Sequence, residues 1–440
     1  MEIILISIFV TGYLLITMEH SIKIDKLIPA LVMMGILWAV IALNHLPVFD
    51  INLEELRLEP THIDEILLHH LGKTAEILIF LLGAMTIVEI IDFFSGFSGI
   101  KKLIKSRSKV TLLWIFGFLS FFLSAIIDNL TATIVLITIL QKLVTNRQLK
   151  LWYAGLIIIA ANAGGAWSPI GDITTTMLWI ADKVSTVNLI KYLVLPSLVC
   201  MLVPFTISSK FKIFKGEFVI PDNLVDSELN PYANKMLFIG LGSILFVPVF
   251  KTVTHLPPYV GMMLALAFVA TVAEFYSNKK FSISKIDSDE ETNHSPIHAS
   301  LTKIELPSIL FFLGILMAVG ALESVGILFD FAGYINEVIP NSDIVIILLG
   351  HLSALIDNVP LVAASIGMFP NPIDDPLWHG IAYSAGTGGS MLIIGSAAGV
   401  VAMGMEKIDF FWYIKNIMIL AMVGFWAGYG TFMLLRDFVF

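Results

Sequence analysis

The sequence predicts an all-α polytopic membrane protein built from two inverted repeats. Of its 440 residues, 57% are hydrophobic and only 14% are charged, and the mean hydropathy is +0.88, far from the composition of a soluble domain. A polar motif in apolar surroundings, Ser-Ala-Ile-Ile-Asp-Asn at 124–129, returns as Ser-Ala-Leu-Ile-Asp-Asn at 353–358. This repetition indicates two halves with the same parts.

Stretches of about 20 apolar residues, the length that one helix needs to cross a bilayer, define the elements of the first half. The first stretch lacks a basic leading region and a cleavage-site pattern, so we expect a retained helix. In order, we expect helices at 2–18, 27–44 and 76–94, two arms at 110–127 and 130–144, an interrupted segment at 151–182 and a helix at 189–208.

The second half contains the same six parts. In order, we expect helices at 234–250, 258–276 and 305–328, two arms at 343–356 and 359–369, an interrupted segment at 377–404 and a helix at 410–436. We therefore predict a first inverted repeat at 1–208, a cytoplasmic linker at 209–233 and a second inverted repeat at 234–440.

The paired arms and the interrupted segments are the unusual parts of each half. The second pair of arms is too short for two crossings and has its polar residues at the junction, which favours a re-entrant hairpin over two helices. Both interrupted segments contain Gly-Gly, five residues and a further Gly, at 164–171 and 388–395. Such glycines favour an unwound break, which membranes tolerate only where the backbone lines an enclosed cavity.

Charge supports ten crossings plus two hairpins. With five crossings in each half, the second half must be inverted relative to the first. Placing both termini outside puts all but six of the 26 Lys and Arg residues on the cytoplasmic side. The six exceptions are Arg57, Lys73, Lys183, Lys191, Lys251 and Arg436. The two hairpin tips then approach the membrane midplane from opposite faces, as in secondary transporters.

The hairpin tips carry the chemistry. Asp128-Asn129 and Asp357-Asn358 each begin a second arm, so helix capping is the simplest explanation. An uncharged residue would cap as well, however, without placing a carboxylate near the membrane centre. Carboxylate and amide oxygens are hard ligands that suit Na⁺ or Li⁺, so these four residues form a candidate metal site. Further candidate oxygens are those of Thr131, Asn162, Ser168, Asp172, Thr174, Thr175, Thr387, Ser390 and Ser396.

Three midplane carboxylates, those of Asp128, Asp172 and Asp357, cannot all stay ionised without a counter-cation. A bound metal ion would expel protons, and protonation would displace the metal ion. This competition gives cation/proton exchange if the loaded site alternates between the two faces and the empty site does not. The three acids would titrate as one coupled set.

Other polar residues have simpler explanations beside functional ones. Glu89, Asp92 and Glu323 lie in apolar helices. Each acid could pair with another group in a structural role, lie exposed at the membrane interface or take part in a proton relay. Histidine is the usual residue for pH sensing, but structural hydrogen bonding is the simpler role for His351 and His379. Cys200 is expected to pack in an apolar run. The acidic external loop at 45–75 contains His45, His62, His69 and His70. Their spacing matches no tight metal-ligand pattern, so we expect the loop to be a solvated amphipathic segment.

These motifs resemble the NhaD-type sodium/proton antiporters of the ion transporter superfamily over nearly the whole chain. The specific parts are the two hairpin motifs, Ala-Asn-Ala-Gly-Gly-Ala-Trp-Ser-Pro-Ile-Gly-Asp-Ile-Thr-Thr at 161–175, and Gly-Thr-Gly-Gly-Ser at 386–390 with Gly-Ser-Ala-Ala-Gly at 395–399. The resemblance implies a homodimer in the plasma membrane and a transport bundle, made of hairpins 110–144 and 342–369 with broken helices 151–182 and 377–404, that moves against a scaffold. The ion-relay residues it implies are Asp128, Asn129, Asn162, Asp172, Thr174, Thr175, Ser353, Asp357, Asn358 and Ser390.

Other functions remain alternatives at this point. A sodium-coupled dicarboxylate symporter or an arsenite/anion permease of the same superfamily would share the fold, but the symporters have Ser-Asn-Thr at the tips, and Asp in place of that Ser would repel a carboxylate substrate. An ion channel would need a continuous conduction path. No nucleophile-base pair or phosphate-binding loop accompanies the acids, so neither an enzyme nor a cofactor is expected, and nothing indicates a nucleic-acid partner.

Overall fold

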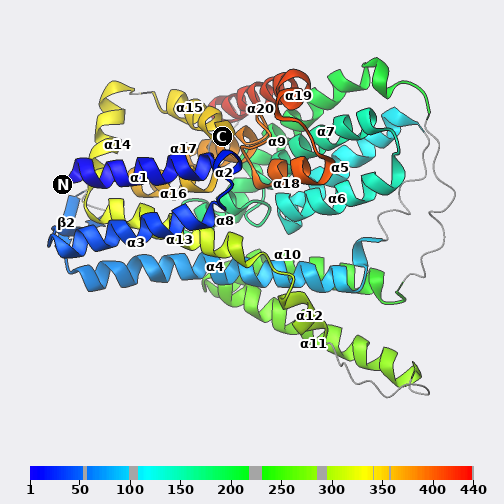
Figure 1. Cartoon of the computed structure of the whole chain (residues 1–440), viewed down its shortest axis with the longest axis horizontal. Helices are drawn as coiled ribbons and strands as arrows, with labels where there is room; N and C mark the ends of the chain where they lie inside the picture. The colour runs from blue at the N-terminus through cyan, green and yellow to red at the C-terminus, as the bar shows by residue number, and fades with distance from the viewer. Residues whose placement is uncertain are drawn as a thin grey trace.

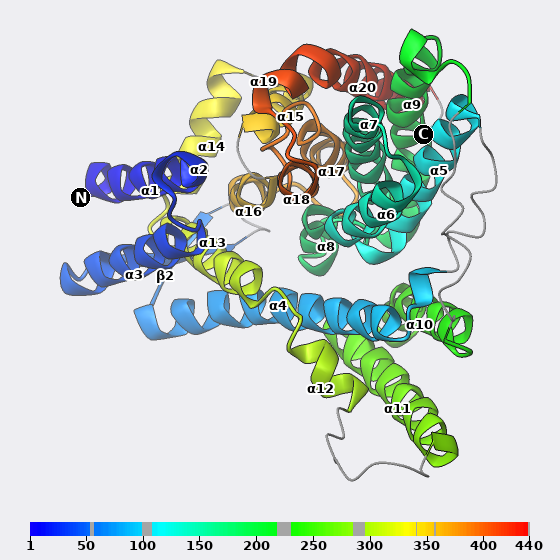
Figure 2. The ribbon, with the colours of Figure 1, turned by 45° about the vertical axis from the view of Figure 1, so that its right-hand side comes forward.

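The computed structural model describes residues 1–52, 57–98, 108–217, 230–284, 295–339, 341–355 and 358–438. It confirms a helical membrane protein with two hairpins and two interrupted helices. The helices form two groups (Figure 2). We call α5–α9 with α15–α20 the hairpin bundle, and α1, α3, α4, α10, α11 and α13 the outer group.

The first half follows the predicted order, with three additions: α2, the 3₁₀ turn η2 and a pair of strands. Its helices are α1 (Glu2–Thr17), α2 (Glu19–Ile22), α3 (Leu27–Leu43), α4 (Ile63–Phe93), α5 (Lys109–Ile127), α6 (Asn129–Leu143), α7 (Arg147–Gly165), α8 (Ile173–Ile180), α9 (Thr186–Ser209) and the 3₁₀ turn η2 (Lys212–Phe214). Strands β1 (Val48–Asn52) and β2 (Arg57–Thr61) pair antiparallel, with Val48 opposite Thr61.

The second half repeats the three helices, the hairpin, the interrupted helix and the final helix, and adds short helices of its own. Its elements are α10 (Ala233–Thr254), α11 (Pro258–Ser284), α12 (Pro296–Leu301), α13 (Leu306–Ser324), α14 (Ile327–Val338), α15 (Ser342–Leu355), α16 (Asn358–Met368), α17 (Pro376–Gly388), α18 (Ala397–Glu406), α19 (Phe410–Tyr413), the π-helical turn η4 (Ile414–Met418) and α20 (Ile419–Phe438). The hairpin α5–α6 and the hairpin α15–α16 enter from opposite ends of the molecule (Figure 1).

Seven helical stretches in the described chain are long and apolar enough to cross a membrane. They are α4, α5, α9, α10, residues 258–277 of α11, α13, and the stretch from α19 through α20. Although α5 meets this length criterion, the chain turns back at Asp128 and α6 returns beside it. Thus α5 is an arm of a hairpin, as predicted.

Each hairpin packs on its interrupted helix through the same pair of contacts. Ser124 Oγ of α5 donates to the Ala161 carbonyl of α7 at 2.6 Å, and Ser353 Oγ of α15 donates to the Ala385 carbonyl of α17 at 2.7 Å. One turn further on, glycine allows the backbones to touch. A Cβ on Gly164 would lie 2.7 Å from Phe121 Cα of α5, far inside normal contact. The two repeats therefore share side-chain geometry as well as helix order.

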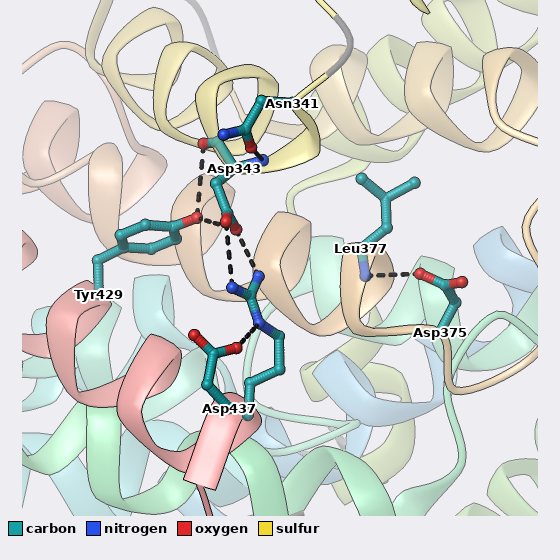
Figure 3. Close-up of polar contacts among 7 residues, drawn as sticks. Asn341, Asp343, Asp375, Leu377, Tyr429 and Asp437 are labelled. Atoms are coloured by element: carbon teal, nitrogen blue, oxygen red, sulfur yellow. Dashed lines mark hydrogen bonds and ion pairs between the residues drawn. The ribbon is translucent and has the colours of Figure 1, made fainter.

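The open end of the second hairpin is tied to α20 (Figure 3). Asp343, in the first turn of α15, accepts hydrogen bonds from Tyr429 Oη at 2.9 Å and from Arg436 Nη2 at 3.1 Å. A second Arg436 nitrogen bonds the other Asp343 oxygen, so the pair is bidentate. This contact fixes the entry of the hairpin against the bundle.

Two sequence-based boundaries were wrong. The external loop predicted at 45–75 contains a β-hairpin and the first turns of α4, and its His70 is buried beneath Gly320 of α13 rather than solvated. Ile66, His70 and Thr74 are buried at four-residue spacing, so a helical face was already encoded there. Helix α14 was missed because Gly326, at φ +78°, ends α13 and lets a new helix begin.

Candidate ion-binding site

The tip of the first hairpin is a single strained residue. Asp128 joins α5 to α6 with φ +78° and ψ 156°, a conformation uncommon for a residue with a Cβ. Its Oδ1 accepts the Thr131 backbone N–H at 2.8 Å, and its Oδ2 accepts the Thr131 hydroxyl at 2.8 Å. The side chain therefore caps α6. Both carboxylate oxygens are held in place by one neighbouring residue.

Asn129 starts a buried chain of side-chain hydrogen bonds across the repeats. Its Nδ2 donates to Asn162 Oδ1 at 3.0 Å, and Asn162 Nδ2 donates to Ser396 Oγ at 2.9 Å. Ser396 also accepts the Gly399 backbone N–H at 3.2 Å and so caps α18. The first hairpin tip is thus connected to the broken helix of the second half.

The second carboxylate is held from both repeats. Asp172 precedes α8 and is only 3% exposed. Its Oδ2 accepts the Thr174 hydroxyl at 2.8 Å and the Asn358 side-chain amide, from the second hairpin tip, at 3.1 Å. Thr175 stabilises the preceding unwound segment, because its hydroxyl donates to the carbonyl of Ser168 at 2.7 Å.

A cavity of about 70 Å³ brings these groups together. Among the residues that line it are Asp128, Asn129, Thr131, Asp172 and Asn358. A space of this size can hold water or a small cation. Asp128 and Asn129 of the first hairpin tip, Asn358 of the second tip and Asp172 of the first broken helix therefore share one small space.

A larger vestibule of about 560 Å³ adjoins the cavity. Leu130 and Thr131 line both spaces. The charged residues of the vestibule are Glu89, Asp92, Lys142, Lys303 and Glu305. Glu89 and Asp92 thus lie on the vestibule wall. Glu323, the counterpart of Asp92 if Gly83 is aligned with Gly314, lies instead near Gly367 of α16.

The other predicted candidates have distinct places. Asp357 lies outside the described residues. Ser353, Thr387 and Ser390 do not line the cavity, and their hydroxyls donate to backbone carbonyls of α17. His351 Nδ1 lies 2.8 Å from the Ile347 carbonyl within its own helix, which fits a structural role.

His379 lies away from the cavity, in the first turn of α17. Its ring stacks on Tyr192 with centroids 4.6 Å apart, and its Nε2 lies 3.5 Å from Asp374 Oδ1. Cys200 is buried in α9, which fits a packing role.

Lys26 is a cavity residue that sequence reasoning missed. It lines the cavity from the start of α3, and its Nζ lies 4.5 Å from the centroid of the Phe311 ring. In the sequence it was counted only as a positive charge beside a crossing helix. Its position ahead of an apolar stretch gives no signal that it would line the cavity.

Comparisons with known proteins place this geometry in a family. A family model described as "Citrate transporter" matches residues 13–379. Sodium/proton antiporter 1 of Arabidopsis thaliana is 42% identical over 439 residues, 98% of this chain and 72% of that protein. The Na⁺/H⁺ antiporter NhaD of Vibrio cholerae is 33% identical over 430 residues, 93% of this chain and 86% of that protein.

The fold also has a match among solved structures. The YdaH transporter of Alcanivorax borkumensis, described as having an unusual topology, superimposes with a TM-score of 0.58 over 94% of this chain and 97% of that chain. Sequence identity is 11%, so this likeness concerns the fold alone. From its sequence relatives, the chain belongs to the citrate-transporter family, among the NhaD-type sodium/proton antiporters.

Proposed function

We propose that this protein is a secondary transporter that exchanges Na⁺ or Li⁺ for protons across the membrane by alternating access. The observation that carries the proposal is the shared cavity, in which Asp128 and Asp172 line one space with the tip amides of Asn129 and Asn358. Anionic oxygens at membrane depth attract a cation and are costly without one. The names of the sodium/proton antiporter relatives agree with this function.

The cation would be bound by oxygens from both hairpin tips. Asp128 and Asn129 supply oxygens from the first tip, and Asn358 and Asp357 supply them from the second. Asp172 contributes the third carboxylate, oriented by Thr174. Hard carboxylate and amide oxygens suit small alkali cations, so we expect Na⁺ and Li⁺ to be the transported ions.

Exchange follows from competition for these carboxylates. Clustered like charges hold protons more tightly, so the cation-free site takes up protons and a bound cation releases them. Lys26 also lines the cavity, and we propose that its positive charge partly balances the carboxylates. A site loaded with either species is close to neutral and can cross, whereas the empty site is charged and is retained.

Alternating access would move the hairpin bundle against the outer group. The bundle contains the predicted transport elements, hairpins 110–144 and 342–369 with broken helices 151–182 and 377–404, and the predicted repeats 1–208 and 234–440 joined by the linker 209–233 supply one hairpin each. In the present conformation the vestibule reaches the cavity beside Thr131. We propose that this is the cytoplasmic side, that both termini lie outside, and that the protein forms a homodimer in the plasma membrane.

Vesicles that contain the purified protein test the function. With an imposed proton gradient and a pH-sensitive dye, addition of Na⁺ or Li⁺ should dissipate the gradient, and K⁺ should do so poorly. Protein-free vesicles control for leak. A lack of response to every alkali cation at neutral and alkaline pH would rule out the exchange.

The family description makes citrate the substrate to test beside the cations. A tricarboxylate would meet Asp128 and Asp172 in the cavity, and like charges at close range repel. We therefore expect no uptake of labelled citrate into the same vesicles. Sodium-dependent citrate uptake without proton movement would favour a symporter instead.

A further inference from the structure

The tip asparagine of each hairpin is held by the residue that precedes a short helix of the opposite repeat. Asn358 bonds Asp172, which precedes α8. Asn129 reaches Ser396, which precedes α18, through Asn162. Asp172 and Ser396 occupy the same place after the Gly-Gly, five-residue, Gly pattern, and their backbones match at φ −146°, ψ 147° and φ −147°, ψ 152°. One position thus carries a carboxylate in the first repeat and a hydroxyl in the second.

The chain of bonds from Ser396 sets the orientation of the Asn129 amide. Ser396 Oγ accepts the Gly399 N–H, which the helix holds in place, and also accepts Asn162 Nδ2. Asn162 then presents its Oδ1 to Asn129 Nδ2. The remaining amide atom, Asn129 Oδ1, is the one left for the cavity that Asn129 lines beside Asp128.

Burial makes this orientation costly to change. Ser396 is 2% exposed, Asn162 is fully buried and Asn129 is 5% exposed. Turning the Asn162 amide over would set its NH₂ against the NH₂ of Asn129, so a buried donor would lose its acceptor unless Asn129 turned as well and withdrew its Oδ1 from the cavity. Ser396 itself does not line the cavity.

We propose that Ser396 is a positioning residue for the cation: through Asn162 it directs Asn129 Oδ1 toward the cavity, and it thereby sets the apparent Na⁺ affinity without touching the ion. The inference rests on the proposed cation exchange and adds a determinant of its affinity. Partners behind metal ligands affect metal affinity by about 10- to 100-fold. Because Ser396 and Asn162 are uncharged, we expect their effect on the apparent Na⁺ affinity to be near the lower end, about tenfold.

The test compares Ser396→Ala with Ser396→Thr, which keeps the hydroxyl, and with Ser365→Ala. Ser365 is a buried serine whose hydroxyl bonds the Leu361 carbonyl of its own helix, so it controls for loss of a buried hydroxyl. The Na⁺ and Li⁺ dependence of exchange is measured for each variant in vesicles. Ser396→Ala should raise the half-saturating Na⁺ concentration about tenfold with a smaller change in maximal rate. Ser396→Thr and Ser365→Ala should resemble the wild type.

A double variant separates positioning from a structural effect. In an Asn129→Ala background the oxygen to be positioned is gone, so Ser396→Ala should cause no further rise in half-saturating Na⁺. Ser396→Gly, which leaves a residue compatible with an N-cap, replaces Ser396→Ala if that variant does not fold. Sodium-induced thermal stabilisation of the purified variants gives a second readout that needs no transport.

Two results would overturn the inference. One is an unchanged half-saturating Na⁺ concentration in Ser396→Ala with a lower maximal rate for both cations, which would indicate a structural role only. The other is an equal rise in the Asn129→Ala background. If the wild-type protein exchanged no cation, the proposed function itself would be wrong. Failure of the proposed function and failure of the role of Ser396 can therefore be told apart in one set of vesicles.

Discussion

Asn358 donates its side-chain amide to Asp172 at 3.1 Å, although 186 residues separate the two in the chain. The bond joins the second hairpin tip to the first broken helix, so we expect the two residues to act as one unit. Asn358→Ala and Asp172→Asn should each lower exchange by about tenfold or more, because a buried charged hydrogen bond is lost. The double variant should be no worse than the poorer single variant.

The matched control for this pair is Asn416→Ala, whose side-chain amide bonds the Trp412 carbonyl of its own helix. It should exchange like the wild type. Strictly additive losses in the double variant would show that Asn358 and Asp172 work independently.

Asp128 combines a cap with a charge, and substitution can separate the two. Asn caps a helix about as well as Asp, so Asp128→Asn should keep the hydrogen bond to Thr131 and change the melting temperature little, while exchange falls to background. Asp409→Asn is the control, because Asp409 also caps a helix, through Trp412 N at 2.9 Å, but lies outside the cavity. Normal exchange by Asp128→Asn would leave capping as its whole role.

The glycine contact between α7 and the first hairpin predicts a defect in folding. A Cβ at Gly164 would overlap the Phe121 backbone, which cannot move as a flexible side chain would. Gly164→Ala should therefore lower the free energy of unfolding by about 1–3 kcal/mol. Gly404→Ala, at a helical glycine with open space around it, should be neutral or slightly stabilising. The melting temperatures of Gly164→Ala and Gly404→Ala, measured in detergent, test this prediction.

The ion pair at the open end of the second hairpin should matter for local order. Asp343→Ala leaves Arg436 and Tyr429 without their shared acceptor, and we expect it to cost about 1.5 kcal/mol. Amide hydrogen exchange along α15 should quicken. Asp437→Ala removes the more exposed partner of Arg436. It should leave the amide exchange rates of α15 unchanged, because exposed ion pairs contribute little to stability.

A loop aspartate gives an acid-dependent prediction. Asp374 accepts the Ser185 N–H at 2.7 Å and the Asn188 amide at 2.8 Å. Burial opposes its ionisation, but these hydrogen bonds together outweigh burial and lower its pKa below 3.8. A depressed carboxyl pKa stabilises the fold above the unfolded value and ceases to do so as the pH falls through the folded value. Asp374→Ala should therefore melt below the wild type at pH 7, and the gap should narrow below about pH 4.

Local features of the sequence were enough to predict the hairpins and broken helices. The predicted arms at 110–127 and 130–144 differ from α5 and α6 by one residue at their outer ends and at the start of α6, because a polar pair in apolar sequence marks a turn clearly. The glycine pattern located both breaks for the same reason: backbone freedom is a property of the residue itself.

The partners within the site could not be predicted in this way. Which side chain Asn129 would face depends on how α7 and α18 pack, and its bond to Ser396 through Asn162 spans the two repeats. Lys26 reaches the cavity because α3 packs on α13, a contact without a local signal. The burial of His70 against α13 is another such tertiary contact, although the helix around it has a local signal in the spacing of Ile66, His70 and Thr74.

The crossed bonds at the tips have a consequence for the separate halves of the chain. Asn358 finds its acceptor, Asp172, in the other half, and Asn162, which accepts from Asn129, donates in turn to Ser396 of the other half. A half expressed alone would therefore fold around buried donors without acceptors. Two halves made as separate polypeptides should become stable only by meeting in antiparallel orientation, as a dual-topology pair would.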